Sequence, residues 1–245
     1  MQKENLHIHS EYSWDSNLKI EDIVKKARES SFGTIAITDH VEMYENVIGL
    51  INKYSIESER YKKIESLKKD IEILHGIELS EPHLRTSDIK LIDELPLDIV
   101  LGSIHDIDKT QTEEDKIIEA YKKYYLKVKN SVLAGNFDVL AHLGYIDRYY
   151  NYPYKNQELL DEILNEIIRK QIALEINTSG LRRKTTPTIP KIDIIERYKK
   201  LGGEIVTIGS DAHREEEIND NIEASYDIAK TLKLRPVTYK NRRIR

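Results

Sequence analysis

The sequence predicts an α/β fold in which parallel strands and crossover helices form one barrel. Seven short β-rich runs alternate with longer stretches of helical periodicity, which is the pattern of parallel strands joined by helices. Most of the runs are continuously apolar, as expected when helices cover both faces of a sheet. The 245 residues suit one α/β barrel, and no repeat, low-complexity segment or long linker divides them. We therefore expect residues 1–245 to form a single domain.

The elements follow from local patterns, taken in chain order. Strands are expected at 5–10, 34–40, 71–79, 98–105, 138–145, 172–179 and 204–213. Apolar residues three and four apart, with Lys and Glu on the opposite face, predict helices at 20–32, 61–70, 87–95, 113–135, 156–171, 189–203 and 221–234. The long polar stretch 41–60 is expected to form a flap.

Composition restricts the classes of function. Hydrophobic residues make up 39% and charged residues 33%, which predicts a folded and soluble chain without an apolar run of about 18 residues to cross a membrane. The absence of cysteine excludes disulfides, thiolate metal sites and cysteine nucleophiles, and we expect a cytoplasmic location without a signal peptide. The net charge of −5 gives no basic field for nucleic acid or membranes, and the basic segment 239–245 is expected to be solvated.

Histidines gather at one end of the expected barrel. Six of the eight lie at or just beyond the carboxyl ends of expected strands: His7, His9, His40, His105, His142 and His213. Two acidic residues, Glu78 and Asp211, lie at the same strand ends. In a barrel of parallel strands these ends converge on the face where active sites are built. Residues two apart on a strand point the same way, so His7 and His9 can face one ion. Imidazole and carboxylate ligands suit zinc, manganese or iron, and their number predicts a cluster of ions.

Other polar residues near these strand ends have simpler interpretations. His75 precedes Glu78 by three residues and should face the opposite side of its strand, and His83 falls in a loop. We expect both to be structural or exposed. Asp39 is expected to form hydrogen bonds at a strand end, and Glu175 with its neighbours to orient other side chains. Two roles are open for Asp15, as a metal ligand and as the cap of a helix.

The motifs HIHS, ITDH, GIELS, GSIHD, AHLGY and GSDAH, in this order, resemble the PHP (polymerase and histidinol phosphatase) family, and within it the histidinol-phosphatase branch. The resemblance spans essentially the whole chain. It implies a distorted (β/α)7 barrel that holds up to three divalent ions at its C-terminal face. Carried over motif by motif, it implies three ligand sets: His7, His9, Glu78 and Asp211; Glu78, His105 and His142; and Asp15, His40 and His213.

The resemblance also implies an activity, the hydrolysis of L-histidinol phosphate to L-histidinol and phosphate in histidine biosynthesis. A hydroxide made available by the ions would attack phosphorus in line. Asp15 or His213 would supply the proton to the leaving alcohol. Arg148 and Arg182 follow the fifth and sixth expected strands and are expected to bind phosphate oxygens in pairs of hydrogen bonds.

Three alternatives stay open at this point. Another PHP phosphoesterase would act on nucleotides, short oligonucleotides or phosphotyrosine, and a non-catalytic protein would only bind metal. Amidohydrolase barrels also begin with His-x-His but commonly bridge two ions through a strand-end lysine, and no expected strand here ends in lysine. The expected partner is a small phosphorylated substrate, with no nucleic acid and no membrane. The metal at each site and the oligomeric state are not indicated by the sequence.

Overall fold

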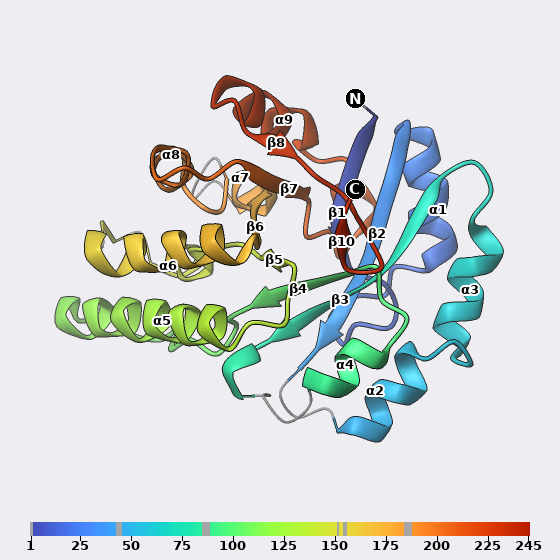
Figure 1. Cartoon of the computed structure of the whole chain (residues 1–245), viewed down its shortest axis with the longest axis horizontal. Helices are drawn as coiled ribbons and strands as arrows, with labels where there is room; N and C mark the ends of the chain where they lie inside the picture. Colours follow the sequence, from blue (N-terminus) through green and yellow to red (C-terminus); the bar gives the residue numbers. More distant parts are fainter. Residues whose placement is uncertain (1, 43–45, 85–88, 151, 154–155, 184–187) are drawn as a thin grey trace.

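The structure, a computed structural model, describes residues 2–42, 46–84, 89–150, 152–153, 156–183 and 188–245. Within these residues, eight parallel strands form one curled sheet in the order β1 to β8, with helices packed around it (Figure 1). The α/β fold with parallel strands in chain order, predicted from the sequence, is confirmed. No described helix is long and apolar enough to cross a membrane.

Each of the seven expected runs contains a strand. The strands are β1 (Lys3–Ile8), β2 (Phe32–Val41), β3 (Glu72–Ser80), β4 (Ile99–Ser103), β5 (Val139–Leu140), β6 (Ala173–Asn177), β7 (Ile205–Gly209) and β8 (Arg235–Pro236). The expected fifth strand was too long. β5 ends at Leu140, and His142 follows it with a left-handed backbone (φ 27°), which takes the chain out of the sheet. The two-residue β8 was not expected, because so short a strand has no periodicity.

The sheet curls until its first and seventh strands meet. Beyond the end of β7, Ala212 forms a parallel bridge with Ile8. The main-chain nitrogen of Asp211 donates to the oxygen of His7, and that of His9 donates to the oxygen of Ala212, both at 2.9 Å. The backbone itself therefore places two motifs more than two hundred residues apart, HIHS and SDAH, side by side.

Seven described helices match the expected ones: α1 (Ile20–Glu29), α3 (Glu59–Leu67), α4 (Ile89–Glu94), α5 (Glu114–Ala134), α6 (Gln157–Lys170), α8 (Ile192–Lys200) and α9 (Ile222–Thr231). α2 (Val47–Tyr54) and α7 (Ser179–Arg183) were not expected. The flap prediction was wrong for 46–60, where α2 and the start of α3 lie. Asn46 caps α2 and Ser58 caps α3 through their side chains, and Tyr54 is buried. Residues 43–45 of that stretch lie outside the described residues.

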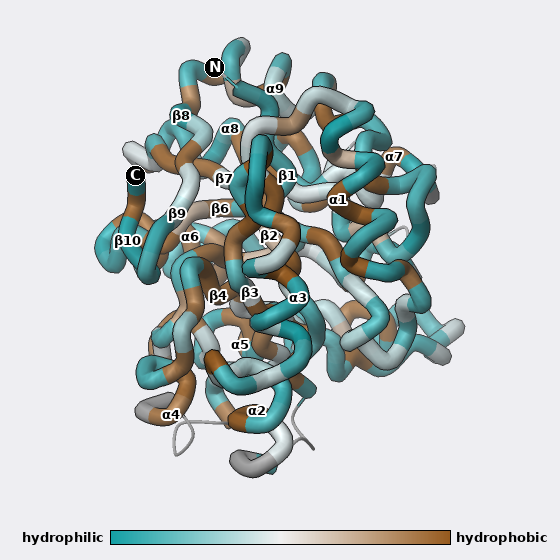
Figure 2. Tube along the Cα trace, turned by 90° about the vertical axis from the view of Figure 1, so that its right-hand side faces the viewer, coloured by the Kyte–Doolittle hydropathy of each residue, from teal (hydrophilic) through white to brown (hydrophobic). Residues whose placement is uncertain are grey.

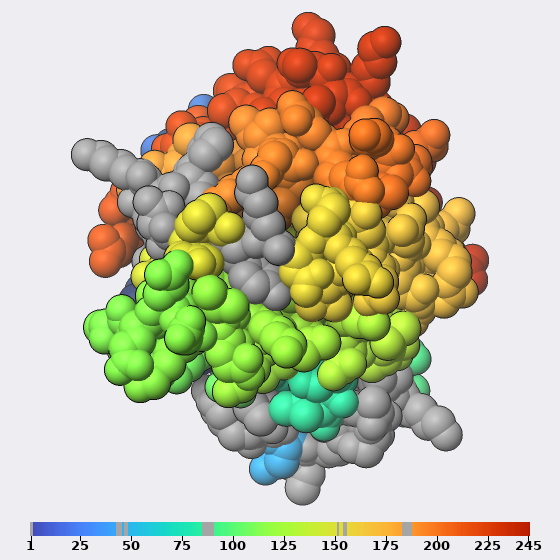
Figure 3. Space-filling model, turned by 90° about the vertical axis from the view of Figure 1, so that its left-hand side faces the viewer, coloured from blue at the N-terminus to red at the C-terminus, as the bar shows by residue number. Residues whose placement is uncertain are grey.

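The helices cover the sheet with their apolar faces. On α1 the buried residues are Ile20, Ile23, Val24 and Ala27, which share one face of the helix, and brown and teal segments alternate along it in Figure 2. α5 and α6 lie side by side on the opposite flank of the molecule (Figure 3). Burial on both faces explains why the strands are continuously apolar in sequence.

The C-terminal residues pack at the end of the barrel where the strands begin. Val237 and Tyr239 pack with strand residues such as Leu6 and Val139 in one buried cluster, and β9 (Tyr239–Lys240) pairs with β10 (Arg243–Ile244) as an antiparallel hairpin. The expectation that segment 239–245 is solvated was wrong for Arg242, which is half-buried and contacts Asp138 at 2.6 Å. Lys240 contacts Asp98 at 3.0 Å and Arg245 contacts Glu72 at 2.7 Å at the same end of the barrel, but both of these side chains are exposed.

Candidate active site

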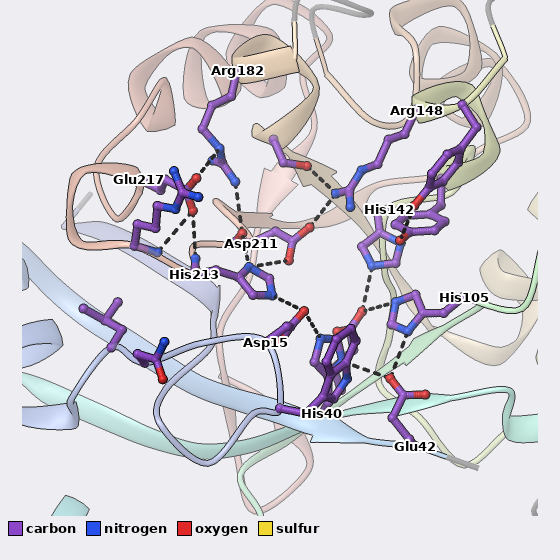
Figure 4. A pocket seen from close by; sticks show the side chains of 18 of the residues that line it. Asp15, His40, Glu42, His105, His142, Arg148, Arg182, Asp211, His213 and Glu217 are labelled. Carbon is purple, nitrogen blue, oxygen red and sulfur yellow. Dashed lines mark hydrogen bonds and ion pairs between the residues drawn. The ribbon is translucent and has the colours of Figure 1, made fainter. Parts of the chain in front are cut away.

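A cavity of about 860 Å³ opens at the carboxyl ends of the strands (Figure 4). Seven of the nine expected ligands line it: Asp15, His40, Glu78, His105, His142, Asp211 and His213. The other two, His7 and His9, are fully buried on or just beyond β1, and the ring of His9 stacks on that of His213 at 4.2 Å. The structure therefore brings together all nine side chains that the sequence placed at this end.

The carboxylate of Glu78 lies at the centre of this group and is fully buried on β3. Five imidazoles surround its two oxygens. Oε1 lies 2.7 Å from His142 Nε2 and 3.2 Å from His105 Nε2, and Oε2 lies 3.0 Å from His40 Nδ1 and 3.5 Å from Nε2 of both His7 and His9. Oε2 accepts no hydrogen bond from any described residue. A buried carboxylate oxygen without a hydrogen bond is costly, so this atom requires another partner, and a metal ion can provide it.

Three residues of the first expected ligand set have the spacing of one coordination sphere. His7 Nε2 and His9 Nε2 are 3.0 Å apart, and Asp211 Oδ1 lies 3.6 Å and 3.3 Å from them. Tetrahedral zinc with bonds of about 2.0–2.1 Å separates its ligand atoms by about 3.3 Å. His7, His9 and Asp211 therefore fit a single ion. Glu78 Oε2 lies 3.5 Å from both imidazole nitrogens but does not group with Asp211.

The ligand atoms of the other two expected sets lie close together, and the groups that they form share residues. Asp15 Oδ2 lies 3.4 Å from His40 Nε2 and 3.1 Å from His213 Nε2, as the third set requires. The second set is divided, since His142 groups with His7 and His105 groups with His40, although both contact Glu78 Oε1. Ligand atoms within 4.8 Å of one another form four overlapping groups: His7, His9 and Asp211; His7, Glu78 and His142; His40, Glu78 and His105; and His9, Asp15, His40 and His213.

The charges of the site are mutually dependent. Burial lowers the pKa of a histidine, but Glu78 and Asp15 together raise the pKa of His40 to about 10, and Glu78 and Glu42 together raise that of His105 to about 9. Burial and neighbouring imidazoles lower the pKa of His9 to about 3, so this ring is neutral. Burial favours the acid form of Glu78 and Asp211, yet their basic neighbours hold both pKa values well below the ordinary range. The buried anionic charge is thus balanced by protons that divalent ions could replace.

Residues behind the ligands hold them in place. Glu175 on β6 contacts His7 Nδ1 at 2.7 Å through one oxygen, and its other oxygen accepts from the main-chain nitrogen of His142 and from Asn177. This is the orienting role that the sequence predicted for Glu175. Asp39 accepts hydrogen bonds at the end of the second strand, as expected, and forms a buried ion pair with Arg60 at 2.7 Å.

Both expected arginines line the cavity (Figure 4). Arg148 donates to Asp211 and Ser179, and its guanidinium lies 4.5 Å from the centre of the Tyr145 ring. Arg182 donates to the main-chain oxygens of Ser210 and Asp211 at 2.8 and 3.0 Å. The two guanidinium groups therefore flank the strand end that carries Asp211.

The sequence analysis missed several residues of the cavity. Glu42 lies 3.5 Å from Nδ1 of both His40 and His105. The spacing rule that paired His7 with His9 would have found it, because Glu42 follows His40 by two residues. Trp14, which is 72% exposed, and Tyr145 also line the cavity, and no sequence signal separates them from other surface aromatic residues.

The two remaining histidines lie away from the cluster, as their positions predicted. His75 contacts Glu65 at 2.6 Å and stacks on Tyr61 with centroids 4.2 Å apart. His83 contacts the hydroxyl of Ser131 at 2.7 Å. Neither is among the described groups of candidate ligands.

Comparison with known proteins gives a consistent result. The chain matches the PHP domain family over residues 5–179. It is 30% identical to a probable histidinol-phosphatase of Clostridium acetobutylicum over 250 residues, which cover 96% of each chain. It is 33% identical to a probable histidinol-phosphatase of Thermotoga maritima over 220 residues, or 89% of this chain and 88% of that protein.

A solved structure is similar over the whole chain. It is the crystal structure of a histidinol phosphate phosphatase from Lactococcus lactis complexed with zinc, L-histidinol and phosphate. The TM-score is 0.83 at 26% sequence identity, and the match covers 100% of this chain and 99% of that one.

Proposed function

The chain belongs to the PHP domain family, and on this premise we propose that it is a metal-dependent phosphomonoesterase that hydrolyses L-histidinol phosphate. The products are L-histidinol and phosphate, as in histidine biosynthesis. The observation that carries the proposal is the convergence of the six histidines with Asp15, Glu78 and Asp211 in one cavity. The chain that forms this cavity is 30–33% identical to histidinol-phosphatases over most of its length.

We further propose that two or three ions of zinc, manganese or iron are held by the nine residues, in the three sets that the family resemblance implies. The spacing of His7, His9 and Asp211 supports one ion between these three residues, with Glu78 beside them. The central position of Glu78 supports its role as the carboxylate shared between ions. When bound, such ions attract a phosphate dianion and make hydroxide available near neutral pH.

Arg148 and Arg182 are proposed to bind the phosphoryl group. Both line the cavity beside Asp211, and Arg148 has an Nε atom without a hydrogen bond to any described residue. A guanidinium can contact two phosphate oxygens at once, and such contacts strengthen as charge develops in the transition state. For the leaving alcohol, Asp15 and His213 are the candidate proton donors, since both lie on the cavity wall 3.1 Å apart.

The test is a comparison of substrates with the purified chain loaded with zinc or manganese. L-histidinol phosphate, a nucleoside monophosphate, a phosphotyrosine peptide and a nucleotide phosphodiester are assayed side by side. We expect the highest kcat/KM for L-histidinol phosphate and a large loss in the Asp211→Asn variant. Cleavage of the phosphodiester alone would mean that the chain is a different PHP phosphoesterase. Full metal loading without hydrolysis of any substrate would mean a metal-binding protein without catalysis.

A cytoplasmic location and the absence of a nucleic-acid partner stay predictions. They rest on a sequence with no cysteine and a net charge of −5.

A further inference from the structure

We infer that Glu42 is a positioning residue that holds the imidazoles of His40 and His105 with their Nε2 atoms toward the ion sites. The inference rests on the proposed function only in taking these two rings as metal ligands. Glu42 follows β2 directly, and its carboxylate lies beside both rings in the cavity wall (Figure 4).

Each of the six histidines of the site has its Nε2 atom within 3.6 Å of a carboxylate oxygen of the site. His40 also presents its Nδ1 atom to the site, 3.0 Å from Glu78 Oε2. For three of them the outer nitrogen, Nδ1, has a partner behind the ring: Glu175 for His7 at 2.7 Å, the Ser13 hydroxyl for His9 at 3.1 Å, and the Asp211 main-chain oxygen for His213 at 3.0 Å. Metal-binding histidines generally use their second nitrogen in this way, which fixes the tautomer and the ring orientation.

Glu42 is placed to do the same for two more rings. Its Oε1 lies 3.5 Å from His105 Nδ1 and 3.5 Å from His40 Nδ1, which is an ion-pair distance, although His40 Nδ1 is nearer still to Glu78. The hydroxyl of Ser80 lies 2.7 Å from Glu42 Oε2 and is also within hydrogen-bond distance of Glu81, so its one proton is shared between these two carboxylates. A carboxylate at Nδ1 keeps the ring proton on that atom, so the Nε2 lone pair remains available to an ion.

One carboxylate therefore serves two ligand sets. His105 Nε2 faces Glu78, whereas His40 Nε2 faces Asp15 on the other side of the site. Loss of the Glu42 charge should weaken ion binding in both sets at once. Loss of a residue that binds a single ion directly should instead empty the site of that ion. This difference separates a positioning residue from a ligand.

The experiment compares Glu42→Gln with Glu57→Gln, which makes the same change of charge at a side chain that is 82% exposed between α2 and α3. Both variants are saturated with zinc. Metal content and the rate of zinc release to a chromogenic chelator are then measured, neither of which requires a substrate. We expect Glu42→Gln to keep full zinc content and to release part of its zinc at least about tenfold faster than wild type. Glu57→Gln should match wild type.

Two results would overturn the inference. Zinc content lower by one ion at saturation would make Glu42 a ligand, and release at the rate of Glu57→Gln would leave it no role at the ions. If Glu42→Gln does not fold, Ser80→Ala, which removes the hydroxyl that holds Glu42, should accelerate release in the same direction but less. Unchanged release in Ser80→Ala would then count against the inference. Failure of the wild type to hydrolyse L-histidinol phosphate would refute the proposed function without changing the outcome of this release test.

Discussion

The two ends of the barrel both carry buried carboxylates, but imidazoles surround the central one at the carboxyl ends of the strands. At the amino ends, Asp98 and Asp138 contact Lys240 and Arg242 from the C-terminal hairpin. At the carboxyl ends, Arg148 contacts Asp211, but within the described part of the chain the ionisable groups in ion-pair range of Glu78 are all imidazoles. Lysine and arginine keep their charge at neutral pH, whereas an imidazole can release its proton and accept a metal ion instead.

The amino end is the closed end, covered by the C-terminal hairpin, where Asp98 and Asp138 pair with side chains that keep their charge at neutral pH. The carboxyl end is the reactive end. The carboxyl end has a buried oxygen of Glu78 and ring nitrogens of His40 and His142 without hydrogen bonds to described residues. Changes at the carboxyl end should therefore remove metal and activity, and changes at the amino end should affect only stability.

The largest effect is expected from Glu78→Gln. An amide cannot replace the charge that five imidazoles surround, so more than one ion site should weaken at once. We expect kcat/KM on L-histidinol phosphate to fall by on the order of 10³-fold, together with metal content. Steady-state kinetics and elemental analysis of the same preparation measure both.

The matched control is His75→Ala, on the same strand but facing away from the cavity toward Glu65 and Tyr61. It should leave kcat and metal content unchanged and reduce stability at most. Near wild-type turnover of Glu78→Gln with full metal content would contradict the central role given to Glu78.

A smaller effect is expected from the arginines of the cavity. Arg148→Met or Arg182→Met should lower kcat/KM by about 10²-fold, or roughly 2.7 kcal/mol, because a donor to the phosphoryl group is lost. Metal content should not change, which separates these variants from Glu78→Gln. An increase in KM alone would indicate uniform substrate binding, and wild-type kinetics for both variants would show that neither arginine contacts the phosphoryl group.

The reactive end of the barrel could be predicted from the sequence more completely than the closed end. Metal-binding residue types are rare, and parallel strands bring their carboxyl ends together, so strand assignment alone gathered His7, Glu78 and Asp211. The hairpin at residues 239–244 could not be foreseen, because it has two residues per strand and its arginines resemble any solvated basic tail. Glu42 was missed for another reason: its spacing of two residues from His40 was available in the sequence, but its contact with His105 from another strand was not.

At the closed end, Arg242→Met should lower the free energy of unfolding by about 2 kcal/mol, because the Asp138 carboxylate would stay largely buried without its cation. Urea denaturation measures this change, and kcat/KM and metal content should be those of wild type. Arg245→Met removes an exposed ion pair with Glu72 and should cost no more than about 1 kcal/mol. Loss of activity in Arg242→Met at full stability would mean that the two ends are not independent.

The last prediction is a pH dependence of stability that the reactive end should show between pH 7 and pH 10 in the absence of metal. In the metal-free protein the pKa of His105 is raised to about 9 and that of His40 to about 10, against about 6.5 in an unfolded chain. A raised pKa stabilises the folded state fully below pH 6.5, and that contribution is lost as the pH rises through 9 and 10. Thermal unfolding of the metal-free chain should therefore show a stability that falls between pH 7 and pH 10.

The comparison between the two ends supplies the controls for this pH dependence. Metal-free Glu78→Gln should lose most of it, because the nearest carboxylate charge that raises both histidine pKa values is gone. Metal-free Arg242→Met should keep it at a lower overall stability, since a guanidinium does not titrate in this range and its removal leaves the imidazoles untouched. A flat profile in the metal-free wild type would mean that its carboxylates are not balanced by protonated imidazoles. Ions would then replace something other than protons when they bind, and the release of protons on zinc addition, measured in weakly buffered solution, should be close to zero.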